Sequence, residues 1–124
     1  MPNVTMARNV TRTATIAINT AITSTSIEKT GLLRGYILTP AAWTAAAIGF
    51  KVSHDNSTFT ILRDETGVAV QITTVLTTAS RAYTLPPELG ACRFFKIWSK
   101  HATAATETDI NQAAARALTI ALAA

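Results

Sequence analysis

The chain has 124 residues, of which 48% are hydrophobic and 15% are charged, and its formal net charge is +4. This length suits one domain with a modest core. Its one cysteine, Cys92, excludes an intrachain disulfide, and no apolar run is long enough to span a membrane. The first residues lack the basic and apolar segments of a secretory signal, so we expect synthesis in the cytoplasm and no membrane partner. Low charge means weak repulsion between copies, which favours a module of an assembly.

The first elements in chain order are an arm and two strands. Residues 1–11 show no apolar period and predict an extended N-terminal arm, followed by a single domain over residues 12–124. Alternation begins at Arg12 and predicts a strand up to Asn19. Residues 32–39 are apolar on both faces, which predicts a central strand that ends at Pro40 because proline cannot donate to a ladder.

The middle of the chain alternates most clearly between apolar and other residues. Residues 48–53, 59–61 and 68–72 each have the period of two of a half-buried strand. His54–Ser57 and Asp64–Gly67 lie between them and are rich in turn-forming residues. The pattern predicts an antiparallel meander of three strands.

The last third predicts further strands and contains one ambiguous segment. Residues 81–85 and 92–99 read as strands. Residues 108–122 fit a helix capped by Thr108, but from Leu118 onward they also alternate as a closing strand would. Because everything before them is β, we predict a loop followed by a strand.

The fold expected from these elements is an all-β antiparallel sandwich of jelly-roll type with about eight strands. Its predicted core consists of Ile16, Ile18, Leu33, Ile37, Phe50, Val52, Phe59, Ile61, Val70, Ile72, Phe95, Ile97, Leu118 and Ile120.

Three sequence patterns carry a resemblance over about residues 12–122. They are Leu33-x-Gly35-x-Ile37-x-x-Pro40-x-x-Trp43-x-x-Ala46, Phe50-x-x-Ser53-x-Asp55-x-x-x-Phe59 and Arg93-Phe94-Phe95-Lys96-Ile97-x-Ser99. Together they resemble small virion proteins of tailed bacteriophages. The last two are also similar to jelly-roll sandwiches of discoidin and galactose-binding type. The resemblance implies a head or other structural protein of the virion.

The function expected on this basis is that of a capsid decoration (cement) protein on the exterior of the phage head. Its expected partners are the major capsid protein and itself, as a homotrimer. Arg8 and Arg12 are the candidates for contact with acidic capsid loops, and Trp98 and Lys100 are candidates for a subunit or capsid interface.

Two alternative functions remain open from the sequence. Tyr36 and Trp43 are candidates for a sugar-stacking platform, which would suit a glycan- or receptor-binding module of a tail fibre or baseplate. A head-completion or tail component is the other alternative. The location of the protein in the virion would distinguish these two functions from capsid decoration.

Catalytic, metal and nucleic-acid functions find little support in the residue pattern. Two histidines, one cysteine and seven scattered acids show no spacing of a nucleophile and a base, so we expect neither an enzyme nor a cofactor. Two pairs of residues could be considered as ligands of a hard cation: His54 with Asp55, and Asp64 with Glu65. Their positions in turns favour turn residues over cation ligands. The eleven basic residues are dispersed, which favours an acidic protein surface over nucleic acid as the partner.

Overall fold

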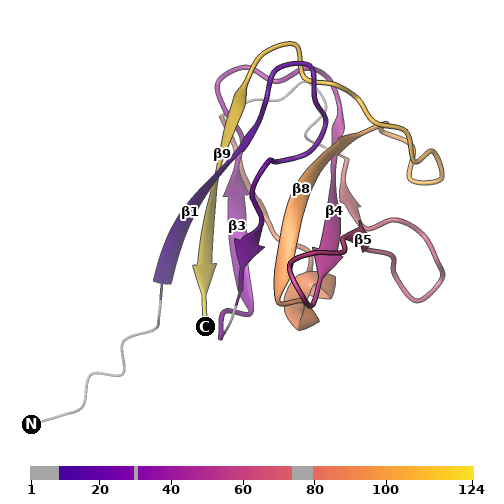
Figure 1. The fold of residues 1–124 in the computed structure, drawn as a ribbon. Helices are drawn as coiled ribbons and strands as arrows, with labels where there is room; N and C mark the ends of the chain where they lie inside the picture. Colours follow the sequence, from indigo (N-terminus) through magenta and orange to yellow (C-terminus); the bar gives the residue numbers. More distant parts are fainter. Residues whose placement is uncertain (1–8, 30, 74–79) are drawn as a thin grey trace, which may run out of the picture.

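The computed structural model describes residues 9–29, 31–73 and 80–124, which form two antiparallel sheets packed face to face (Figure 1). Sheet A has the order β1-β9-β3-β7, formed by Asn9–Ile16, Arg116–Ala123, Arg34–Leu38 and Ala82–Thr84. Sheet B has the order β2-β8-β4-β5, formed by Ile27–Glu28, Phe94–Lys100, Ala47–Ser53 and Thr60–Ile61, and β6 (Gln71–Ile72) also pairs with β4. The predicted antiparallel sandwich is confirmed.

The chain crosses between the sheets at most of its connections, which produces the strand order of a jelly roll with β6 as an addition. A 3-10 helix, η1 (Pro87–Ala91), joins β7 to β8. No helix among the described residues is long and apolar enough to cross a lipid bilayer.

The core lies between the sheets because alternate residues of each strand point inward. Ile37 of β3 pairs with Ile120 of β9, and both side chains are fully buried. On the facing sheet the rings of Phe50 and Phe95 meet edge to face, with centroids 6.2 Å apart. Each such side chain contributes about 1.5–3 kcal/mol by leaving water.

The first strand begins earlier than the sequence predicted. β1 starts at Asn9 and pairs with β9 from Asn9 opposite Ala123 onward. Residues 9–11 therefore belong to sheet A and not to an arm, because β9 supplies a partner that the local pattern does not reveal. Residues 1–8 lie outside the described part, so the arm there stays a prediction.

Two residues of the predicted core are exposed. Ile18 is 57% exposed because β1 ends at Ile16 and the chain turns at Asn19, whose φ is 61°. Leu33 is 64% exposed, and the preceding residue, Leu32, occupies the core in its place. In both cases alternation was extended past the end of a strand.

The register of β5 corrects two further core predictions. Ile61 pairs with Lys51 and shares its outward face, so Phe59 and Ile61 do not line the core. Leu62 packs against the core instead, and its backbone N–H donates to Phe50 O at 2.9 Å. A slip of one residue reverses which side chains face inward.

The segment before β9 is a loop, as predicted, and a buried glutamine shows why. Gln112 is fully buried, and its Oε1 accepts from Thr44 N at 2.9 Å while its Nε2 donates to Ser99 Oγ at 2.8 Å. Arg116 Nε also donates to Gln112 Oε1, at 3.2 Å. These bonds tie the loop across the end of the sandwich, and a helix would withdraw Gln112 from its partners.

Candidate interaction surfaces

The outer face of sheet A is built mainly from small, uncharged side chains, and we call it the Thr/Ala face. The residues that define it are Thr11, Thr13, Thr119, Ala121, Ala123 and Thr84. Tyr36 and Leu38 are its larger members, 43% and 37% exposed. Among the outward residues of these four strands, Arg34 is the one that carries a charge. Such a face presents hydroxyl and methyl groups to a partner.

A hollow of about 380 Å³ lies on the Thr/Ala face beside Tyr36. It is lined by residues of β1, β3 and β9, and it forms where the small Ala121 separates Thr11 from Tyr36. Gly35 keeps the two strands close, since a Cβ there would lie 1.9 Å from Ala121 O. The hollow is therefore part of the sheet geometry.

The predicted sugar-stacking platform of Tyr36 and Trp43 is not assembled. Trp43 is 9% exposed, belongs to the core, and donates from Nε1 to Ala46 O at 3.1 Å. Its ring closes the core and is not available for stacking, whereas Tyr36 is exposed on sheet A.

The outer face of sheet B carries a pair of lysines on neighbouring strands, and we call it the lysine face. Lys51 of β4 lies directly opposite Lys96 of β8. Lys51 Nζ lies 4.9 Å from the centroid of the Trp98 ring, and Lys96 Nζ lies 4.7 Å from that of Phe59. These cation–π contacts separate the two charges without neutralising them.

Two acidic side chains beside this face form ion pairs with arginines. Arg63 Nη2 lies 2.5 Å from Glu107 Oε2, and Arg93 lies 3.6 Å from Glu28. Like charges directly opposite on antiparallel strands are destabilising. Lys51 and Lys96 therefore offer a pair of positive charges to an acidic group from outside.

Phe59 divides the lysine face into two shallow depressions. One, of about 370 Å³, is lined by Lys51, Ile61 and Arg63. The other, of about 340 Å³, includes Lys96 and Asn56. Each depression thus has a lysine in its wall and room for a side chain from a partner. The sequence prediction missed Lys51 and Lys96, because their opposition depends on the register of β4 with β8.

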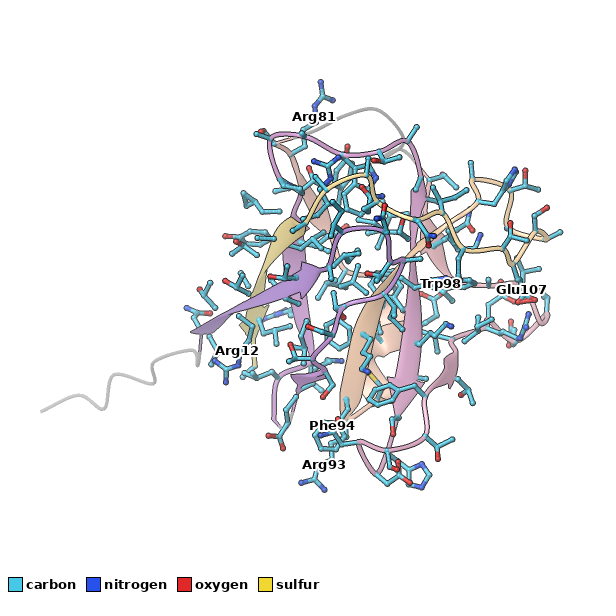
Figure 2. All side chains as sticks on the ribbon, turned by 45° about the horizontal axis from the view of Figure 1, so that its top comes forward. Arg12, Arg81, Arg93, Phe94, Trp98 and Glu107 are labelled. Atoms are coloured by element: carbon cyan, nitrogen blue, oxygen red, sulfur yellow. The ribbon has the colours of Figure 1, made fainter. Side chains whose placement is uncertain are left out.

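Trp98 and Lys100, predicted at an interface, are buried within this domain. They are 1% and 0% exposed, and the loop after β8 covers them. Trp98 Nε1 donates to Asp109 Oδ1 at 2.7 Å, and Figure 2 shows Trp98 inside the outline of the molecule. Alternation placed both side chains on the outer face correctly, but gave no sign of the covering loop.

Lys100 holds that loop on sheet B. Its Nζ donates to His101 O at 2.8 Å, to Thr103 O at 3.2 Å and to the side chain of Gln71. Burial lowers the pKa of Lys100, and Glu107 opposes that effect. Lys100 thus has a structural role that excludes it from a surface contact.

Of the two arginines predicted to contact the capsid, the structure describes only Arg12. Arg12 is exposed, lies at the β1 side of the molecule (Figure 2) and donates weakly to Thr11 O at 3.4 Å. Arg8 falls outside the described residues, so its role stays a prediction.

The carboxylate of the turn residue Asp55 accepts hydrogen bonds from its own turn. Asp55 Oδ1 accepts from the N–H groups of Ser57 and Thr58 at 2.9 and 3.0 Å and from Ser53 Oγ at 2.8 Å. These bonds lower the pKa of Asp55 to about 2. Among the described residues no group of three acidic, histidine or cysteine side chains is placed to hold a metal. The expected absence of a metal nevertheless stays a prediction.

Comparison with known proteins yields one informative likeness. No family model and no curated protein sequence matches the chain. The crystal structure of the SPBc2 prophage-derived protein YomS is similar in fold, with a TM-score of 0.56 and 8% sequence identity, and the match covers 98% of this chain and all of that one. At this identity the likeness concerns the fold, and the sandwich described above is therefore shared, over its full length, with a protein encoded by a prophage.

Proposed function

We propose that this protein is a capsid decoration protein that binds the outer surface of a phage head through its lysine face. The observation that carries the proposal is the opposition of Lys51 and Lys96 on neighbouring strands. Two facing ammonium groups are unfavourable in the free protein, and an acidic partner converts that cost into attraction. Acidic loops of a major capsid protein are a partner of this chemistry.

The setting of the proposal comes from the fold comparison. The protein of similar fold is described as prophage-derived, and the likeness spans nearly all of this chain. The sequence patterns that resemble small virion proteins of tailed phages support the same setting. A surface role also agrees with the small depressions beside Phe59, which accept side chains and not an extended substrate.

The proposal is tested by the position and copy number of the protein in purified virions. Gold-labelled antibody and quantitative mass spectrometry are expected to place it on the head, in a number proportional to the capsid subunits. A few copies per particle at the neck or tail would contradict the proposal and would favour a head-completion or tail component. The protein added to isolated heads should also protect them against thermal opening.

One observation favours a second candidate, a glycan-binding module of a tail fibre or baseplate. Tyr36 lines the hollow on the Thr/Ala face and offers an exposed ring there. In this alternative a glycan array detects binding by the parent protein, and Tyr36→Ala abolishes it while the melting temperature is retained. An array without binding above background removes this candidate.

A further inference from the structure

The free edge of sheet A is the longest unpaired backbone edge among the described residues. β1 has eight residues and pairs with β9 on one side. On its other side, among the described residues, only the end at Thr15 and Ile16 is bridged, to Ser24 and Thr23, so the unpaired stretch begins at Asn9 and ends before Thr15. The other edge strands, β2, β5, β6 and β7, have only two or three residues each. Proteins usually shorten, charge or cover such edges, because unpaired N–H and C=O groups recruit another strand.

The backbone groups that point to this free edge can be identified. Ser24 N donates to Thr15 O at 3.2 Å, so Thr15 directs its backbone away from β9. Backbone groups alternate along a strand, so Thr13, Thr11 and Asn9 point the same way. Arg12 Nη1 reaches Thr11 O along this side at a long 3.4 Å, which is the weak cover that the described residues provide.

We propose that β1 pairs antiparallel with β1 of a second copy across a two-fold axis at Thr11. Thr11 then faces Thr11 of the partner subunit, and Asn9 and Thr13 of each copy face each other. All three are residues whose backbone points to the free edge, so each pair exchanges two hydrogen bonds. The two copies of sheet A become one continuous sheet.

The side chains fit this register. Threonine pairs on facing strands are favourable, and the strand contains no proline or glycine that would weaken pairing. The neighbouring register, centred at Arg12, would bring two guanidinium groups directly opposite each other. The Thr11 register sets Arg12 opposite Val10 of the other copy, which is why the two-fold axis is assigned to Thr11.

A second copy of the chain is a matching source of the missing strand. It brings an edge of the same length and sequence, which is related to this one by symmetry.

The pairing is tested on the full chain in solution by sedimentation velocity over a concentration series. The expected species is a dimer of the 13.2 kDa chain. Thr11→Lys sets two ammonium groups face to face at the axis and should weaken the dimerisation constant by at least about tenfold. Thr15→Lys is the matched control: it adds the same charge to the same face and strand, outside the paired residues, and should change the constant by less than about twofold.

Three results would overturn the pairing: a monomer throughout the series, a trimer, or equal effects of the two lysine variants. The same sedimentation experiment therefore distinguishes this two-fold dimer from the homotrimer expected from the sequence. Both variants alter exposed positions, and their melting temperatures establish that they are folded. Since the free protein is used, failure here leaves the proposed head binding intact, and failure of head binding leaves the dimer intact.

Discussion

The two outer faces of the sandwich differ in chemistry although both belong to antiparallel sheets. On sheet A, Thr11 stands beside Ala121 and Ala121 beside Tyr36, and no charge lies at the centre. On sheet B, Lys51 stands opposite Lys96, and a loop covers Trp98 next to them. The first face consists mainly of small, uncharged side chains, while the second is partly covered by a loop and carries two facing positive charges.

Under the proposed function, this difference separates the features that serve folding from those that would serve a partner. Trp98 and Lys100 are buried and bonded on the covered half of the lysine face, so they stabilise this domain. Lys51 and Lys96 bring the domain a repulsion that folding does not require. Local features that disagree with the fold are expected at functional sites.

The largest expected effect tests whether Trp98 stabilises the fold or belongs to an interface. Trp98→Ala should lower the free energy of unfolding by about 3–5 kcal/mol, because it removes a fully buried ring and the bond to Asp109. Tyr36→Ala on the Thr/Ala face should cost less than about 1 kcal/mol. Urea unfolding of the two variants measures the difference. A similar loss of unfolding free energy in the two variants would contradict the burial of Trp98 and the exposure of Tyr36.

The next effect concerns the close approach of strands under the Thr/Ala face. Gly35→Ala places a Cβ 1.9 Å from the backbone oxygen of Ala121 and should destabilise the domain by about 2–3 kcal/mol. Gly90→Ala is the control, since its Cβ would meet nothing nearer than 4.0 Å. Thermal unfolding of both variants checks the prediction, which is contradicted if Gly35→Ala melts with the parent.

The sequence predicted the sheets well because alternation and turn chemistry are local signals. The strands around Ile37, Phe50 and Phe95, and the turns that contain Asp55 and Asp64, follow from residues within a few positions of each other. The loop before β9 was also predicted, from its β surroundings.

The candidate site was harder to predict because it depends on distant residues. Burial of Trp98 depends on Asp109, and the opposition of Lys51 to Lys96 depends on the register of β4 with β8. The start of β1 at Asn9 depends on pairing with β9, more than one hundred residues later. Ile61 was placed on the wrong face because nothing local reveals a shift by one residue.

The stability contributed by the Asp55 turn, beside the lysine face, should depend on pH. The folded pKa of Asp55 is about 2, below the ordinary value of 3.8, so the unfolded chain takes up the proton first as pH falls. The stabilisation by Asp55 is therefore complete above pH 3.8 and is lost between 3.8 and about 2. The difference in melting temperature between the parent and Asp55→Asn should shrink over this window. A constant difference down to pH 2 would contradict the hydrogen-bonded carboxylate.

The smallest expected effect has an unusual sign. Lys51→Gln should raise the free energy of unfolding by about 0.3 kcal/mol, because it removes one of two facing charges. Arg34→Gln removes a charge from the Thr/Ala face and should leave stability within error. Differential scanning calorimetry at low salt, where repulsion is strongest, measures both. A loss of stability in Lys51→Gln would mean that its contact with Trp98 outweighs the repulsion.

The most direct test of the account is binding to isolated phage heads by two variants of equal charge. Lys51→Gln/Lys96→Gln and Arg34→Gln/Arg81→Gln each lower the net charge of +4 by two. The account predicts that the first variant loses at least about tenfold in affinity, with a weaker dependence on salt, while the second stays within about twofold of the parent. Equal losses in the two variants, or full affinity in the first, would contradict the claim that the lysine face meets the capsid.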